Sequence, residues 1–231
     1  MLRRFEIYGL RSDAAPEAVT SLVMACRRSG DFIPEVLHSR VGWSRTGGRP
    51  QLVWEHAFGS PASYQRYMVH PYHASVLDRF LLHDSPERVV VDTDLGAGLV
   101  GYHCDGPVFA IAGGIRRLVL LRIDDGASSD EISRLRQVLA HGPVDDDRMT
   151  LSVSAANTLG AAWFDGMTPV GPPPRFTHLW EQGFADLDML DGYRAGTSAL
   201  ATAERRGWEG WMDGIVTRTA SLHYEIDGPR I

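Results

Sequence analysis

Apolar residues recur along the chain either at every second position, which predicts strands, or three and four positions apart, which predicts helices. Strands and helices predicted in this way follow one another in a regular order. Residues 4–10 alternate with a period of two, as in a strand with one buried face. Residues 16–29 follow Asp13 and Pro16, a helix start signal, and their apolar side chains recur three and four residues apart. The same criteria predict further strands at 35–43, 50–59 and 88–94 and helices at 61–70 and 72–83.

The rest of the chain shows the same order of predicted elements. Strands are expected near 115–123, 149–156, 176–184 and 215–226, and helices near 129–140 and 186–206. Each half is therefore predicted as strand, helix, strand, strand, helix, strand. Since predicted strands and helices occur together in both halves, the predicted fold class is α+β.

Four short sequence matches indicate that the second half is a diverged copy of the first. The matched pairs are 2–5 with 115–118, 53–58 with 179–184, Tyr67 with Tyr193, and 88–94 with 221–227. They occur in the same order in both halves. The sequence therefore predicts two repeats, at 1–95 and 115–231.

Glycine and proline mark the expected connections. Residues 96–114 hold seven glycine or proline residues, which favours a linker between the repeats. The second repeat has an insertion at 164–175 with three consecutive prolines, so this segment is expected to be a loop. It is either a lid over a site or a surface loop without a role.

Composition excludes several classes of chemistry. The 231 residues include 23 basic and 29 acidic side chains, and every basic one is arginine. Without lysine there is no side-chain amine for Schiff-base chemistry or for a phosphate-binding loop. A net charge of -6 gives no basic surface for nucleic acid or an anionic membrane.

Two cysteines form no disulfide framework, and no apolar run approaches the roughly 18 residues of a membrane span. The start of the chain carries charge within its apolar stretch, unlike a signal peptide. A cytoplasmic location is expected. No glycine-rich signature follows a predicted strand, so no nucleotide cofactor is implied.

The segment from Tyr67 to His73 holds the strongest candidate chemistry. Pro71 disfavours helical backbone at His70, so one helix is expected to end there and the next to begin. His73 falls in the first turn of that second helix, where the helix dipole favours a neutral imidazole that can act as a base. Tyr67 could direct its hydroxyl into the same pocket. Alternatively, the two histidines only cap or pack helix ends.

The first 95 residues resemble the stress-responsive dimeric α/β-barrel (Dabb) family. The resemblance rests on residues 32–36, the strand ending in Phe58, the Tyr-x-x-His-Pro-x-His segment and the closing residues 91–94. It implies ferredoxin-like repeats whose sheets pack face to face, so two repeats in one chain would form an intramolecular pseudo-dimeric barrel. A monomer or a homodimer is expected.

Family resemblance also implies roles for individual residues. Polyketide cyclases of this family use no cofactor; by analogy His73 removes a proton beside a carbonyl and Tyr67 holds the enolate. His70, Val76, Cys26 and Leu52 are expected at the pocket, the last two in place of a family tyrosine and histidine. In the second repeat that histidine is retained as His178.

The strand that ends in Phe58 supplies two further candidates. Trp54 and His56 share one face of it, so both are expected to contact a ligand, or else to be core residues. His56, His70 and His73 could together bind a metal, but no compact ligand motif supports this, and none is predicted.

Three functions follow. The preferred one is a cofactor-independent cyclase or lyase acting on a carbonyl-bearing, polyketide-like small molecule. The alternatives are a cofactor-free monooxygenase of aromatic substrates and a non-catalytic stress-response protein.

Overall fold

The structure, a computed structural model, describes residues 1–48, 51–91, 99–104, 114–141, 148–158, 176–196, 201–203, 206 and 214–226. The predicted insertion at 164–175 lies outside these residues. Within them, no helix combines the length and apolar character needed to cross a membrane.

The first half of the chain forms helices that pack on one strand layer. Its elements are β1 (Leu2–Leu10), α1 (Pro16–Arg27), α2 (Ser29–Phe32), β2 (Val36–Ser44), β3 (Leu52–Phe58), α3 (Pro61–Met68), the π-helix η1 (His73–Leu77), α4 (Asp78–Leu81) and β4 (Val90–Val91). Proline occupies the first turn of both α1 and α3, where its missing N–H costs nothing. Ser60 caps α3 by accepting the Ser63 N–H at 3.1 Å.

The second half repeats much of this order. Its elements are β5 (Leu99–His103), β6 (Gly114–Ile123), α5 (Ser129–His141), β7 (Met149–Ala156), β8 (His178–Phe184), α6 (Leu187–Ala195) and β9 (Val216–Ile226). Asp186 caps α6 by accepting the Met189 N–H at 2.8 Å.

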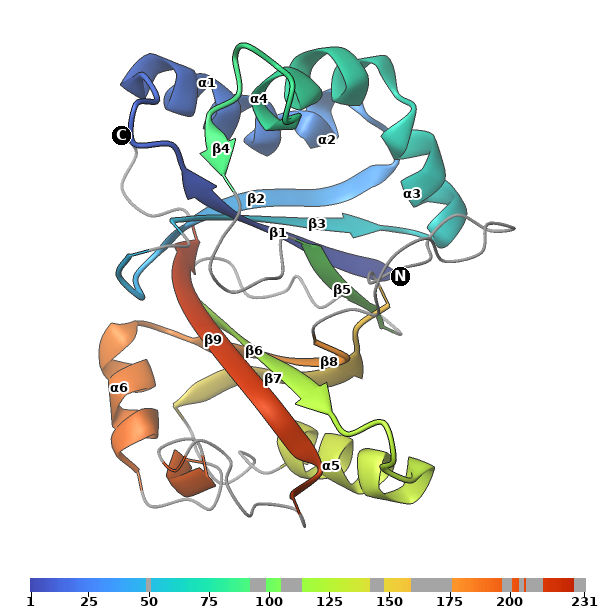
Figure 1. Ribbon diagram of the computed structural model, residues 1–231, viewed down its shortest axis with the longest axis vertical. Helices are drawn as coiled ribbons and strands as arrows, with labels where there is room; N and C mark the ends of the chain where they lie inside the picture. Colours follow the sequence, from blue (N-terminus) through green and yellow to red (C-terminus); the bar gives the residue numbers. More distant parts are fainter. Residues whose placement is uncertain are drawn as a thin grey trace.

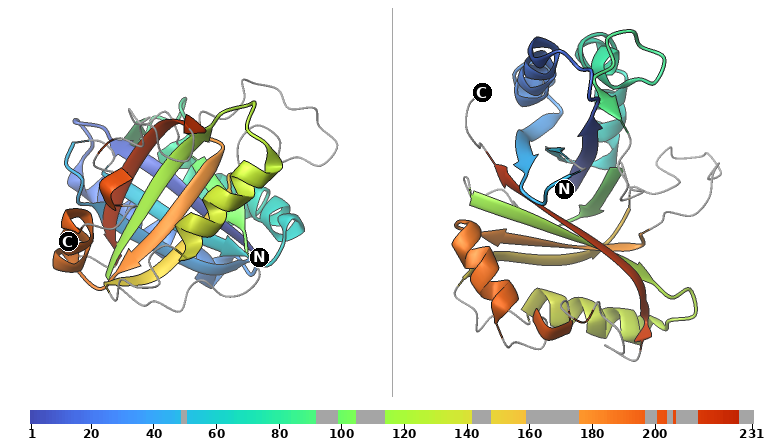
Figure 2. Two further views of the ribbon diagram at one scale, coloured as in Figure 1. Left: turned by 90° about the horizontal axis from the view of Figure 1, so that it is seen from below. Right: turned by 60° about the vertical axis from the view of Figure 1, so that its left-hand side comes forward.

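All strand pairs are antiparallel, and the strand order is β4-β1-β3-β2-β9-β6-β8-β7, with β5 also paired to β1. The residues after β7 return to β5, since Thr158 donates its N–H to the Gly101 carbonyl at 2.8 Å. Helices α1–α4 cover the outer face of β1–β3, and α5 and α6 cover the outer face of the layer made by β6–β9 (Figure 1). Figure 2 shows the two strand layers facing each other between these helices.

Alternation along the strands separates three cores. One lies between the first strand layer and its helices, and a second occupies the same place in the other half. The third fills the space between the strand layers and includes Phe5, Ile7, Val53, Leu118 and Leu222. The fold is thus α+β with antiparallel strands, of the ferredoxin-like class, as the sequence predicted.

Several predicted elements differ in detail. The glycine-rich segment 96–114 was expected to be a linker, but residues 99–103 form β5 and Gly114 begins β6. Val100 and Tyr102 are buried and alternate, so this strand completes the edge of β1 beyond the short β4. The predicted helix 72–83 is a π-helix followed by one α-helical turn, and helix 16–29 ends at Arg27.

Candidate active site

Three of the predicted residues meet between the first strand layer and its helices. His56 comes from β3, Tyr67 from α3 and His73 from the start of η1, and all three are buried. The Tyr67 and His73 ring centres are 4.5 Å apart, and those of His56 and Tyr67 are 5.7 Å apart, both edge to face. The structure therefore brings together side chains that the sequence placed on three separate elements.

Local structure explains how the two helical residues reach this place. Tyr64 and Tyr67 lie one turn apart on the buried face of α3. The helix ends before Pro71, and His70 accepts the Tyr72 N–H through Nδ1 at 3.2 Å, an arrangement that suits a capping role. The π-helix begins at His73; such widened turns are frequent at functional sites.

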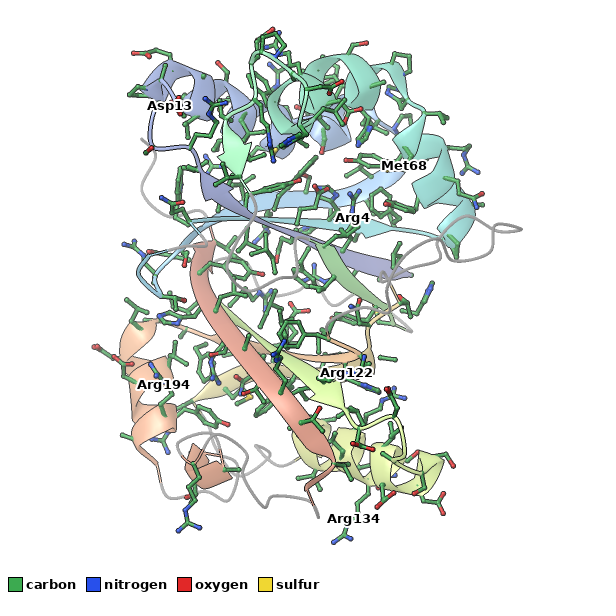
Figure 3. All side chains as sticks on the ribbon, viewed as in Figure 1. Arg4, Asp13, Met68, Arg122, Arg134 and Arg194 are labelled. Atoms are coloured by element: carbon green, nitrogen blue, oxygen red, sulfur yellow. The ribbon has the colours of Figure 1, made fainter. Side chains whose placement is uncertain are left out.

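Two charged residues of β1, which the sequence analysis did not single out, complete the cluster. Arg4 lies directly opposite His56 in the β1–β3 pairing, and Glu6 lies opposite Trp54. Arg4 Nη2 and Glu6 Oε1 form a buried ion pair at 2.6 Å. Figure 3 places Arg4 between the strands and the helices, and its guanidinium lies 4.9 Å from the Tyr64 ring centre and 5.6 Å from that of Tyr67.

Burial keeps the two imidazoles neutral. Desolvation, followed by the positive charge of Arg4, lowers the pKa of His73 to about 4 and also lowers that of His56 well below its usual value. Desolvation raises the pKa of Tyr67 well above its usual range, so its hydroxyl stays protonated. Both histidines can therefore accept a proton at neutral pH.

Many polar atoms of this cluster have no hydrogen-bond partner among the described residues. They are both ring nitrogens of His56, the Tyr67 hydroxyl, Nδ1 of His73, and Nε and Nη1 of Arg4. The Asp78 carboxylate lies 3.7 Å from His73 Nδ1, beyond hydrogen-bond distance. Buried polar atoms normally have partners, so the cluster presents donors and acceptors suited to a ligand.

The remaining predicted pocket residues form the surroundings of the cluster. Trp54 is buried, donates its indole N–H to Ser39 Oγ at 2.8 Å and packs edge-on against His56. Cys26 and Leu52 are buried, and Val76 is half-buried against the same core. Burial, with the nearby Glu6 carboxylate, raises the pKa of the Cys26 thiol well above its usual value, so it stays a neutral thiol.

Solved structures share this fold at low sequence identity. A protein described as a putative monooxygenase from Fusobacterium nucleatum has a TM-score of 0.60 at 5% identity, with 97% of this chain and 91% of that chain covered. A second protein so described, from Lactobacillus acidophilus, gives 0.55 at 10% identity, covering 98% and 93%. Chlorite dismutase from Candidatus Nitrospira defluvii gives 0.58 at 8%, covering 98% and 90%. The chain has the fold of these proteins.

These findings correct the predicted membership of the Dabb family, which is wrong. No protein-family model and no curated protein matches the chain, and the structural neighbours named above are two proteins described as putative monooxygenases and a chlorite dismutase. The short His-Pro-x-His segment misled the assignment because any helix that ends before a proline can place two histidines at that junction.

A metal site receives no support from the described part of the chain, where no three His, Cys, Asp or Glu side chains are grouped to hold an ion. His178 lies at the start of β8 and is separate from the cluster.

Proposed function

We propose that the Arg4, Glu6, His56, Tyr67 and His73 cluster is the active site of a small-molecule enzyme. The substrate class is an aromatic compound with an acidic C–H or O–H group, and the reaction is oxidation by dioxygen without an organic cofactor. The observation that carries this proposal is the set of buried donors and acceptors without partners. The likeness to the proteins described as monooxygenases favours oxidation over the cyclase or lyase reaction that the sequence suggested.

The chemistry of the cluster suits deprotonation. A neutral His73 or His56 accepts the substrate proton, and the resulting anion is stabilised by the Arg4 guanidinium and by a hydrogen bond from Tyr67. Binding of that anion beside the imidazole also raises the basicity of the imidazole, because a negative charge favours the protonated ring. Phe58, Tyr64 and Trp54 supply flat apolar walls for an aromatic substrate.

Oxidation balances without a reductant when the substrate itself supplies four electrons. A methylene group that has lost one proton to His73 reacts with dioxygen and forms a hydroperoxide at its carbon. Loss of the second C–H proton and cleavage of the O–O bond leave a carbonyl and one molecule of water. The overall change is CH2 plus O2 to C=O plus H2O.

Oxygen uptake with anthrone tests the proposal, because the anthrone methylene is acidic: loss of one of its protons gives a phenolate anion. His73→Asn is expected to lower kcat/KM by about 10²- to 10⁴-fold, the usual contribution of a general base. His83→Asn, which changes an exposed histidine, is the matched control.

Equal rates in the two variants would contradict the role of His73. Turnover of a polyketide-like carbonyl substrate under nitrogen, without oxygen uptake, would instead favour the cyclase or lyase alternative.

We further propose that residues 1–95 and 115–231 are two copies of one unit and form a pseudo-dimeric barrel within one chain. Matching contacts support this: the indole N–H groups of Trp54 and Trp180 donate to Ser39 and Ser152, each at 2.8 Å. These serines in turn donate to the carbonyls of Cys26 in α1 and Leu139 in α5. A monomeric mass by light scattering would fit a barrel closed within the chain, and a dimeric mass would indicate that barrels pair.

A further inference from the structure

An open cavity of about 280 Å³ lies on the outer side of the second half, away from the proposed active site. It is lined by Ser133, Arg136, Gln137, Ala140 and Ser154. Four of these residues lie on one face of α5, three or four positions apart, and Ser154 comes from β7. The volume suits a small ligand or one group of a larger ligand.

The floor of this cavity holds a polar group that nothing in the described residues satisfies. Ser154 is 8% exposed, and its hydroxyl makes no hydrogen bond. A buried hydroxyl without a partner costs free energy, so a bound acceptor there would recover it. The exposed Arg136 lies at the rim. The pKa of His178 is lowered mainly by desolvation and further by the positive charge of Arg136, which therefore lies near it.

Comparison with the first half shows what is unusual about these positions. Ser154 pairs with Trp180 as Val41 pairs with Trp54, and His178 begins β8 as Leu52 begins β3. Ser39 donates to the Cys26 carbonyl and Ser152 to the Leu139 carbonyl, so Cys26 of α1 corresponds to Leu139 of α5. With this alignment of the two helices, Arg136 corresponds to Val23. In the first half, all three positions are apolar and buried: Val23, Val41 and Leu52.

We propose that this cavity binds the oxyanion of a small molecule, a carboxylate or a phosphate. Arg136 is its charged donor and is suited to such groups by its planar, forked geometry. The Ser133 and Ser154 hydroxyls supply neutral donors around it. None of the lining residues is acidic. The inference is independent of the proposed function, since no residue is shared between the two sites.

Benzoate and inorganic phosphate are the probes, and neutral benzamide is the shape control. Binding is measured by ligand-observed NMR and by backbone amide shifts of α5 and β7. Arg136→Gln is expected to weaken benzoate or phosphate binding about tenfold or more, as expected for loss of a charge-assisted hydrogen bond. Arg134→Gln on the same helix, whose side chain points away from the strands in Figure 3, is expected to leave binding unchanged.

Ser154→Val gives a second, independent test, because it introduces the residue found at the matching first-half position. It fills the floor of the cavity and removes the unpaired hydroxyl, so the protein should fold normally while benzoate and phosphate binding is lost. His73→Asn should not affect binding of either probe, which separates this site from the active site. Absence of saturable binding by both probes, or equal losses in the Arg134 and Arg136 variants, would overturn the proposal.

Discussion

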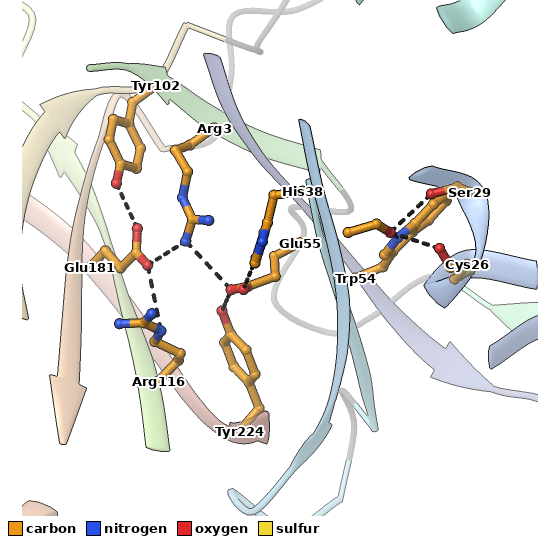
Figure 4. Close-up of polar contacts among 11 residues, drawn as sticks. Arg3, Cys26, Ser29, His38, Trp54, Glu55, Tyr102, Arg116, Glu181 and Tyr224 are labelled. Carbon is orange, nitrogen blue, oxygen red and sulfur yellow. Dashed lines mark hydrogen bonds and ion pairs between the residues drawn. The ribbon is translucent and has the colours of Figure 1, made fainter. Parts of the chain in front are cut away.

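Arg3 and Arg4 are neighbours on β1 but point to opposite faces, into two buried clusters with opposite character. Arg3 points between the strand layers, where Nη2 donates to Glu181 at 2.7 Å and approaches Glu55 at 3.5 Å. Figure 4 shows that Tyr102 and Tyr224 donate their hydroxyls to the same two carboxylates, which His38 and Arg116 also approach. Arg4 points under the helices, where several of its neighbours have no partner.

The difference separates a structural network from the proposed active site. In the inner cluster both carboxylates contact arginine and accept a tyrosine hydroxyl, so the burial of charge is compensated within the protein. In the outer cluster Arg4 pairs with Glu6, but the ring nitrogens of His56 and the Tyr67 hydroxyl have no partner among the described residues, and the protein carries the cost of their burial. Residues one position apart on β1 therefore belong to two separate clusters, the inner network and the proposed active site.

Breaking the inner cluster should have the largest effect on stability. Glu181→Gln removes the charge that faces Arg3 and leaves a buried guanidinium poorly compensated, which costs roughly 3–5 kcal/mol in comparable pairs. Urea unfolding measures the loss. Glu225→Gln, at the surface pair with Arg45, is the control and should cost no more than about 1 kcal/mol. Similar losses in both variants would refute the structural role of the inner network.

Acid titration should distinguish the clusters by the pH at which each loses its contribution. The folded-state pKa of His73, about 4, lies below its ordinary value of 6.5, so the unfolded chain binds the proton more readily. Its contribution, roughly 3 kcal/mol for a shift of this size, is complete above pH 6.5 and is lost as pH falls through 4. Burial favours a neutral Glu55, but the charge of Arg3 and a hydrogen bond from His38 lower its pKa from 4.5 to about 2. That contribution is present above pH 4.5 and is lost as pH falls through 2.

Stability measured from pH 8 to pH 2 therefore should decline in two stages. His73→Asn is expected to make the stage between pH 6.5 and 4 shallower and to leave the lower stage unchanged; the slope that remains comes in part from His56, whose pKa is also lowered by burial. A variant whose slope between pH 6.5 and 4 matches that of the unmodified protein would show that His73 is already solvated in the folded state.

Periodicity and internal matches predicted most of the strands and helices, because these depend on residues close in sequence. The strand β5 was missed since its glycine-rich surroundings favoured a connection, although Val100 and Tyr102 alternate as strand residues do. The π-helix at His73 was not predictable from spacing, because a segment of 5 residues is too short for its apolar pattern to distinguish an α-helix from a π-helix.

The candidate site was predicted in part. Tyr67, His73 and His56 were selected for their chemistry, and the structure brings them together, but Arg4 and Glu6 were overlooked. A signal for them existed: the paired arginines at 3–4 recur at 116–117, and Arg4 and Glu6 are two residues apart on one face of a strand. Their partner across the sheet could not be known without the register that sets Arg4 opposite His56.

A smaller effect is expected from exchanging one matched position between the halves. Gln182 lies opposite Arg117 as His56 lies opposite Arg4, and its amide oxygen accepts from Arg117 Nη1 at 2.8 Å. His56→Gln should let Arg4 form the same hydrogen bond and remove two unpaired ring nitrogens. We expect a gain of about 1 kcal/mol in the free energy of unfolding, measured by urea denaturation, together with slower oxygen uptake.

The reciprocal change, Gln182→His, takes the acceptor away from Arg117 and should destabilise the protein by a similar amount. Opposite signs in the two variants would show that the outer cluster keeps its unpaired imidazole at a cost in stability, as a binding site does. If both variants instead lose a similar amount of unfolding free energy, His56 is optimally packed against Trp54 and Tyr67. Its two unpaired nitrogens would then give no argument for a ligand.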